Sequence, residues 1–312
     1  MGQNTRDIRV WAALAIVYVV WGSTYLGIRI TIETIPPMLS GGVRFVLSGL
    51  ILGLVLALTR GRAVFRMTRA EFLGASVVGV LLLTAGNGMV SVAEKYISSG
   101  LAALLVASVP LWLVIFRVAV RDRPHALTVT GVLVGFCGVA GLSLTGGGSG
   151  AAAGIVIILC GALAWSVGSF LSGRLPMPKD PFTASTVEML VGGVVMLAVS
   201  PLLGEHVDVG AVGTGSWVAL TYLVLVGSLA GFTSYVWLLG NAPISLVSTY
   251  AYVNPVVAVV LGVVVLDESV TAQMFAAGAV IVLGVALVVS TERRGRRAGD
   301  AAPAGKSELS RS

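Results

Sequence analysis

Apolar runs long enough to cross a lipid bilayer occupy most of this 312-residue sequence. Only 11% of the residues are charged and 56% are hydrophobic, whereas soluble domains carry about 25% charged residues. A soluble fold of this length could not bury so much apolar surface, so the composition predicts an all-α membrane protein. The ten predicted transmembrane helices, each close to the ~20 residues that a span needs, are Val10–Ile28, Pro37–Leu58, Ala70–Val92, Ser99–Val120, Ala126–Leu144, Ala151–Leu171, Phe182–Leu203, Trp217–Leu239, Ser245–Leu266 and Ala272–Val289.

Two related stretches divide the chain into halves. Ser98–Pro124 reads SSGLAALLVASVPLWLVIFRVAVRDRP, and Pro243–Ser269 reads PISLVSTYAYVNPVVAVVLGVVVLDES. Each copy is apolar with one proline at its middle, Pro110 in the first and Pro255 in the second, at an offset of 145 residues. A membrane chain built twice over, with an interrupted helix in each copy, is the plan of a secondary transporter.

The same offset recurs elsewhere in the sequence. Trp21–Arg29 (WGSTYLGIR) matches Trp165–Arg174 (WSVGSFLSGR) with one residue inserted, and Arg44 aligns with Glu188. Each half has five spans, an odd number, so the second half is expected to sit inverted in the membrane relative to the first, with a substrate site near the midplane. The predicted units are a first five-helix repeat over 1–146, a second five-helix repeat over 147–291, and a disordered basic cytoplasmic tail over 292–312.

The distribution of basic residues predicts the orientation. With the N-terminus in the cytoplasm, sixteen Lys and Arg residues fall in cytoplasmic segments, and only Arg29 and Lys95 fall on the other side. This bias places both termini of a multi-pass protein in the cytoplasm, in a cell membrane of the bacterial type. The first apolar run is interpreted as a span and not as a signal peptide, because it has a counterpart in the second half.

Two motifs resemble those of a known family. The letters VPLW surround Pro110, and YVNPVVAVVLGVVVLDE occupies Tyr252–Glu268, followed by Gly278 and by GVAL at Gly284–Leu287. These residues resemble the drug/metabolite transporter superfamily, and more closely its ten-span EamA-type exporters. The second-half motif is the more specific of the two.

This resemblance covers nearly the whole chain, from about Trp11 to Ser290. It implies a ten-helix inverted-repeat fold, in which the first four helices of each repeat enclose the cavity, and export of small metabolites or drugs. The first half departs from the family pattern at Arg121-Asp122-Arg123, where a Gly-Glu pair is common. Family substrates are diverse, so the resemblance leaves the cargo open.

Arg44 and Glu188 are the predicted charged groups of a substrate site. Arg44 stands about seven residues inside its span, ~10 Å from the boundary at ~1.5 Å rise per residue, and a charge near mid-bilayer costs about 2.5–3.5 kcal/mol on insertion scales. Both side chains should therefore face the protein interior. One interpretation has Arg44 anchor an anionic group while Glu188 carries a proton or binds a cation. The alternative is an ion pair between them that only fixes helix packing.

The two mid-span prolines are predicted to gate access. Pro110 and Pro255 each remove one helical hydrogen bond and free a carbonyl, which could line a cavity and flex, or could produce a static bend. Asn254 is expected either to bind substrate or to satisfy a freed carbonyl.

Further polar and aromatic residues complete the predicted substrate site. Uncharged polar groups within lipid should face the bundle, because an unpartnered buried polar group costs free energy. Aromatic rings could form walls around a flat or cationic substrate, or could serve packing alone. These candidates are Trp21, Tyr25, Asn87, Trp165, Tyr235 and Tyr250.

Several other functions lack the residues that they need. The two histidines, His125 and His206, fall in predicted loops, there is no HExxH, and AGKS at Ala304–Ser307 lacks the glycine of a phosphate loop. We therefore expect no enzyme, no cofactor and no metal site. Cys137 and Cys160 are interpreted as small core residues. Nucleic acid is not an expected partner, because the basic residues lie between apolar runs.

The expected partners are a small-molecule substrate, the lipid bilayer and protons, with a homodimer left open by a GxxxG at Gly131 and Gly135. The predicted function is secondary active export of amino-acid-like compounds or amphiphilic drugs by alternating access, with proton coupling. An uncoupled facilitator or exchanger of the same fold is the main alternative. A membrane scaffold or sensor without flux is a third.

Overall fold

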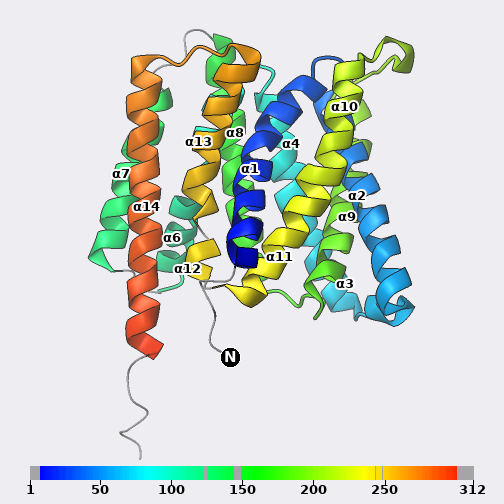
Figure 1. Cartoon of the computed structure of the whole chain (residues 1–312), viewed down its shortest axis with the longest axis horizontal. Helices are drawn as coiled ribbons and strands as arrows, with labels where there is room; N and C mark the ends of the chain where they lie inside the picture. The colour runs from blue at the N-terminus through cyan, green and yellow to red at the C-terminus, as the bar shows by residue number, and fades with distance from the viewer. Residues whose placement is uncertain (1–7, 122–124, 144–148, 243, 248, 301–312) are drawn as a thin grey trace, which may run out of the picture.

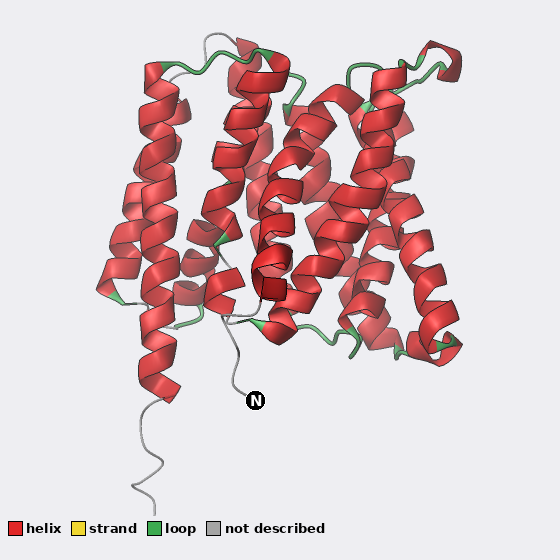
Figure 2. Cartoon of the chain, in the orientation of Figure 1, coloured by secondary structure: helices red, strands yellow, loops and turns green. Residues whose placement is uncertain are grey.

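The computed structural model describes residues 8–121, 125–143, 149–242, 244–247 and 249–300, and the regular structure among them is entirely helical (Figure 2). The first half contains α1 (Ile8–Thr31), α2 (Pro37–Arg60), η1 (Arg62–Phe65), α3 (Arg69–Gly79), η2 (Val80–Asn87), α4 (Gly88–Ala93), α5 (Ser99–Val106), α6 (Val109–Ala119) and α7 (Ala126–Ser143). The second half contains α8 (Ser149–Ser172), α9 (Pro181–Leu202), η3 (Val209–Ala211), α10 (Thr214–Tyr222), η4 (Leu223–Ala230), α11 (Gly231–Asn241), α12 (Ile244–Val247), α13 (Tyr250–Leu266) and α14 (Ala272–Asp300).

Among these residues, eight helical stretches are long and apolar enough to cross a membrane, and Ala126–Leu142 and Tyr250–Leu266 are shorter apolar helices. Their bounds follow the predicted spans to within a few residues, except at the C-terminal end of the last one. The predicted all-α membrane class is confirmed. The count of ten spans and the inversion of the halves stay predictions.

The surface of the bundle is apolar around its waist, as a protein in lipid requires. Along α2, for example, Leu50, Leu54 and Leu58 are exposed, the last to 77%. Cys137 and Cys160 also lie on the exposed surface, so their interpretation as core residues was wrong. A cysteine is small and apolar enough to face lipid tails as readily as a core.

The helices run alternately up and down between two edges of the bundle (Figure 1). In Figure 1, α1 begins at the lower edge, and α14 descends to that same edge. The connections at the lower edge carry most of the basic residues, and we call it the basic edge. The other edge carries the connections 32–36, 94–98, 203–213 and 267–271, and we call it the acidic edge. These connections hold six acidic residues, namely Glu33, Glu94, Glu205, Asp208, Asp267 and Glu268.

The two halves interlock by packing helices of one against helices of the other. α2 packs on α9, α7 on α14, α1 on α10, η4 and α11, and α8 on η2 and α4. In Figure 1, α7 and α14 stand side by side at the left, although their first residues, Ala126 and Ala272, are 146 positions apart in the sequence. The core is therefore shared between the halves, and neither half buries its helices alone.

Glycines allow α7 and α14 to come very close. A Cβ atom at Gly284 would stand 2.5 Å from the Gly135 nitrogen and 2.7 Å from the Gly131 oxygen, both main-chain atoms. The GxxxG of α7 is thus used within the chain. It gives no support to a homodimer, which was the reading that the sequence had left open.

The third span of each half contains a segment of π-helix. η2 follows α3 and leads into α4, and η4 follows α10 and leads into α11. Each π turn widens the ladder from i→i+4 to i→i+5 bonding, and such bulges occur often at functional sites. The two π segments begin 143 residues apart, at Val80 and Leu223, so they occupy equivalent places in the halves.

The two mid-span prolines differ in their structural effect. Pro110 was predicted to kink a continuous helix, but α5 ends at Val106 and Pro110 lies in the first turn of a new helix, α6. This position suits proline, because the first turn does not use its missing N–H. Pro255 does lie inside a helix, α13, where it leaves the carbonyl of Ala251 without its helical donor.

The last helix runs further than its apolar segment. α14 continues past Val289 through the basic residues to Asp300. The first part of the tail 292–312, predicted to be disordered, is therefore helical, since a helix once formed propagates at low cost and Glu, Arg and Ala favour it. Residues 301–312 lie outside the described residues.

Candidate functional site

Arg44 lies in the interior of the bundle, as its predicted role requires. Its side chain is 5% exposed, and its Nε donates a hydrogen bond of 3.0 Å to Ser228 Oγ in η4. Its Nη1 is buried with no hydrogen-bond partner. A buried guanidinium nitrogen without an acceptor is costly, so Nη1 keeps an unused capacity to donate a hydrogen bond.

Glu188 is half-buried on α9 and stands against α3. A Cβ atom at Gly79 would lie 2.6 Å from the Glu188 Cα, so only glycine permits this approach. No hydrogen bond or ion pair joins the Glu188 carboxylate to another residue of the described part of the chain. Arg44 and Glu188 are not an ion pair; within the described ranges the ion pair observed is Arg60–Asp180 at the basic edge.

Three aromatic rings from three helices meet in one cluster, which we call the aromatic cluster: Trp21 of α1, Tyr235 of α11 and Tyr250 of α13. The ring centroid of Trp21 lies 5.1 Å from that of Tyr235 and 5.2 Å from that of Tyr250, and the centroids of the two tyrosine rings are 5.8 Å apart. Two of the three contacts are edge-on, the geometry that aromatic quadrupoles favour. All three residues were predicted as site candidates from the sequence, but their contact with one another was not predicted.

Asn254 lies one turn above Tyr250 on α13, close to α1. With its amide oriented to suit its neighbours, its nitrogen donates to the carbonyls of Tyr250 and Tyr18, each at 3.2 Å. Asn254 therefore satisfies main-chain groups at the junction of α1 and α13. The carbonyl of Ala251, which Pro255 deprives of its donor, is not among its partners.

Trp21 and Trp165 make equivalent contacts across the halves. A Cβ atom at Gly231 would stand 2.6 Å from the Trp21 indole nitrogen, and one at Gly86 would stand 2.9 Å from a ring carbon of Trp165. Each tryptophan thus lies on a glycine at or beside the π segment of the opposite half. Trp165 does not join the aromatic cluster, and Asn87, next to Gly86, holds a buried side-chain oxygen without a partner.

Tyr25 lies one turn from Trp21 on α1 but packs on a different part of the core, with Ile28, Leu105 and Leu223. The structure thus brings together Trp21, Tyr235, Tyr250 and Asn254. Arg44 of α2 packs against η4, and Glu188 of α9 packs against α3. Trp165 of α8 packs against η2, which contains Asn87. These groups all lie inside the bundle, on the faces where the halves meet.

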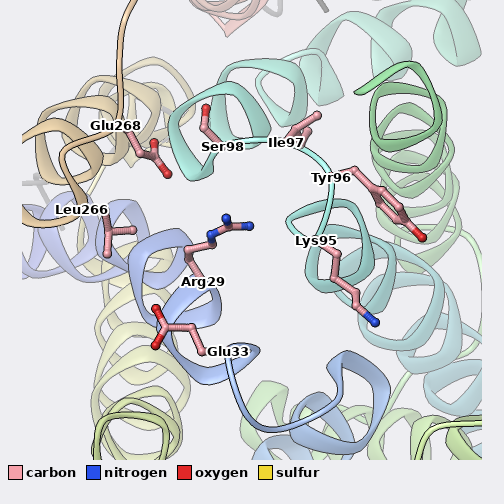
Figure 3. Close-up of a pocket in the computed structure, with 8 residues that line it drawn as sticks. All are labelled: Arg29, Glu33, Lys95, Tyr96, Ile97, Ser98, Leu266 and Glu268. Carbon is pink, nitrogen blue, oxygen red and sulfur yellow. The ribbon is translucent and has the colours of Figure 1, made fainter. Parts of the chain in front are cut away.

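A pocket of about 370 Å³ opens at the acidic edge, and sequence reasoning missed it (Figure 3). Glu268 on its wall accepts hydrogen bonds from the main-chain nitrogens of Ser99 at 2.8 Å and Gly100 at 3.1 Å. This carboxylate caps the N-terminus of α5, where the helix dipole favours a negative charge. The lining residues, none of which is a predicted site residue, are Arg29, Glu33, Lys95, Tyr96, Ile97, Ser98, Leu266 and Glu268.

Comparison with known proteins identifies the family. The sequence profile of the EamA-like transporter family matches the chain twice, over residues 9–144 and over 152–290. The chain belongs to the EamA-like transporter family. Its membership confirms the resemblance to this family, and the two matches fall one in each predicted repeat.

Relatives of this EamA chain come from bacteria, archaea and plants. A protein of Escherichia coli K12 called "Uncharacterized inner membrane transporter YedA" is 38% identical over 280 residues, covering 89% of this chain and 90% of its own. "Uncharacterized transporter YvbV" of Bacillus subtilis is 24% identical, covering 91% and 92%. These names support a multi-pass membrane transporter and not an enzyme.

A solved structure shares the fold. A crystal structure of another protein superposes with a TM-score of 0.65 and covers 91% of this chain and 98% of that chain, at 23% sequence identity. At this identity the likeness concerns the fold alone.

Proposed function

We propose that this EamA transporter is a secondary active exporter of small metabolites, which works by alternating access between the two edges of the bundle. The observation that carries the proposal is the pair of charged side chains, Arg44 and Glu188, that lie inside the bundle without pairing with each other. A static membrane protein gains nothing from burying an Arg nitrogen with no acceptor, whereas a transporter needs such a group to hold its cargo.

The proposed architecture is ten spans in two inverted five-helix repeats over 1–146 and 147–291. It is supported by the double match to one family profile, the equivalent π segments η2 and η4, and the reciprocal contacts of Trp21 and Trp165. We assign the basic edge, with both termini, to the cytoplasm of a bacterial-type cell, because Lys and Arg gather there.

The proposed substrate carries a carboxylate or another anionic group beside an apolar or cationic part. Arg44 Nη1 would hold the anionic group, because guanidinium nitrogens form strong charge-assisted bonds with it. The aromatic cluster would contact the apolar or cationic part through its ring faces. Amino-acid-like compounds and amphiphilic drugs both have this pattern.

Protons are the proposed coupling ions, and Glu188 is their proposed carrier within the spans. Its carboxylate has no partner in the described part of the chain, so a proton can bind it without first displacing an Arg or Lys. Export would then draw on the inward proton gradient, with substrate and proton bound alternately.

An uncoupled facilitator or exchanger would use the same fold and binding groups. Its flux would follow the substrate gradient and ignore an imposed pH gradient. A scaffold or sensor would show no flux at all. A single flux assay, run with and without a pH gradient, therefore distinguishes the coupled exporter, the uncoupled facilitator and the scaffold.

The test is a substrate panel. Purified protein is reconstituted into liposomes loaded with amino acids, their analogues or amphiphilic dyes, and release is followed against protein-free liposomes. We expect release of at least one class of compound. Cells that express the protein should also tolerate a higher external dose of that class. Absence of flux across the panel, with folded protein in the liposomes, would favour the scaffold.

Glu188→Gln is expected to abolish the response to a pH gradient. For one proton exchanged per substrate, a gradient of one pH unit supports up to about a tenfold accumulation, since ~1.4 kcal/mol corresponds to a factor of ten. The glutamine variant cannot carry the proton, so its accumulation should fall to about onefold while exchange at equal pH continues.

The matched control is Asp208→Asn, which neutralises an exposed carboxylate in the connection 203–213 and should retain the full response. A Glu188→Gln protein that still accumulates substrate tenfold would assign the coupling to another group.

A further inference from the structure

Glu94 is a buried carboxylic acid that the proposed transport cycle does not use. It follows α4 directly, two residues beyond the end of the predicted span Ala70–Val92. The structure buries it completely, at 0% exposure, and both of its carboxylate oxygens lack a hydrogen-bond partner. Its main-chain nitrogen donates to the Val90 carbonyl at 3.0 Å, so the residue is held in place by the end of the helix.

The cation nearest to this acid does not neutralise it through a hydrogen bond. Arg29 of α1 directs its guanidinium to the main-chain carbonyl of Glu94, leaving both carboxylate oxygens unbound. Glu268, which follows α13, adds a second negative charge nearby, and its own oxygens are occupied by the N–H groups of Ser99 and Gly100. Tyr25 of α1 is the uncharged titratable group that faces Glu94.

The other helices packed on α4 bring no charge to this place. α8 has no acidic or basic residue from Ser149 to Ser172. On α2, Arg44 bonds Ser228 of η4, and Arg60 pairs with Asp180 at the basic edge. An ionised Glu94 would therefore stand unbonded in the interior, beside another carboxylate, with Arg29 as the opposing charge that acts on it.

Electrostatics favours the protonated form for the same reasons. Burial raises the pKa of Glu94 well above the ordinary glutamate value, the Glu268 carboxylate raises it further, and Arg29 lowers it. Burial is the largest of these influences, because removal from water disfavours the charged form.

The pocket at the acidic edge is lined by residues that neighbour Glu94. Arg29, Lys95 and Glu268 line the pocket at the acidic edge, and they are respectively the hydrogen-bond partner, the next residue and the electrostatic neighbour of Glu94 (Figure 3). Glu94 itself does not line the pocket.

We propose that Glu94 is a proton-binding site at the acidic edge, separate from Glu188, which exchanges its proton with the pocket lined by Arg29, Lys95 and Glu268. When the acid releases its proton to pocket water, the carboxylate draws the Arg29 guanidinium from the Glu94 carbonyl and tightens α1 against the end of α4. A role for this site in coupling rests on the proposed function; the binding of the proton does not.

The test is an infrared titration of purified protein in lipid, read in the carbonyl-stretch band of protonated carboxyl groups. A Glu188→Gln background removes the other acid in question. We expect a protonated-carboxyl band near neutral pH that Glu94→Gln abolishes. Glu33→Gln, an exposed glutamate of the same edge, should leave the band unchanged. A band that survives Glu94→Gln would overturn the proposal, as would its absence at neutral pH in the Glu94-containing protein.

Thermal stability gives a second readout that needs no substrate. A group whose pKa is raised in the folded protein holds more protons folded than unfolded, so stability falls as pH rises through the range between the two pKa values. The melting temperature should therefore decline as pH rises from about 5, just above the unfolded glutamate value of ~4.3, and Glu94→Gln should flatten this decline. An unchanged slope in a folded Glu94→Gln protein would count against the site.

The two proposals fail separately. If no compound of the substrate panel moves but the infrared band and the melting slope both depend on Glu94, the proton site stands and the transport proposal falls. If flux is coupled to protons and Glu94→Gln alters neither the band nor the slope, the coupling belongs to Glu188 alone.

Discussion

Replacing Arg44 with methionine is expected to lower transport at least about tenfold while leaving the protein at least as resistant to heat as the parent. A cation at mid-bilayer costs about 2.5–3.5 kcal/mol, and the hydrogen bond to Ser228 Oγ returns only part of that, about 1.5–3 kcal/mol for a charged donor. Methionine fills a similar space without charge. The substrate loses its anionic contact, so flux should fall roughly tenfold or more.

The measurement pairs a melting curve with flux of the panel compound that the parent transports. Arg44→Lys keeps the charge but loses the planar fork and should retain part of the flux. Arg69→Met, at the exposed start of α3, is the matched control and should change neither quantity by much. If Arg44→Met lowered stability and flux together, Arg44 would be a packing residue.

Gly284→Ala is expected to destabilise the protein severely, although it adds only one methyl group. The new Cβ atom would lie 2.5 Å and 2.6 Å from two main-chain atoms of Gly135, and neither can rotate away as a side-chain end would. Overpacking of this kind costs about 1–3 kcal/mol, and here α14 must move off α7 as a whole. Gly284→Leu should leave no folded protein after extraction from the membrane.

Melting temperature and the fraction that elutes as a single species in detergent report the effect. Gly173→Ala, at the end of α8, is the control, because a Cβ atom there meets nothing within 4 Å. Both variants replace one glycine with alanine and so add one methyl group. Equal behaviour of the two would mean that α7 and α14 are less closely packed than described.

The spans were predictable because hydropathy alone decides which segments enter a bilayer. The mid-span breaks were less so. A proline within an apolar run signals a missing hydrogen bond, but whether the chain bends, as at Pro255, or starts a new helix, as at Pro110, depends on neighbouring packing. The π segments η2 and η4 left no recognisable sign in the sequence, since one extra residue per turn changes no composition.

The charged candidates Arg44 and Glu188 were found because an ionisable residue inside an apolar run is conspicuous. That they do not pair with each other was not predictable, because pairing depends on how α2 and α9 are rotated about their axes. Glu94 was missed for the opposite reason. It stands just outside an apolar run, where a connection exposed to water would be expected. Only the tertiary fold, which brings Arg29 and Glu268 close to it, makes it an interior group.

The pairing of α7 with α14 has a consequence for biosynthesis. The ribosome completes α7 well before it makes α14, the last helix of the chain. Until then α7 has contacts with α5 and α6 but lacks the helix that packs against its glycines. The bundle is therefore complete only when the final helix has been inserted. Chains truncated before Ala272 should be degraded by membrane proteases even if their earlier helices insert normally.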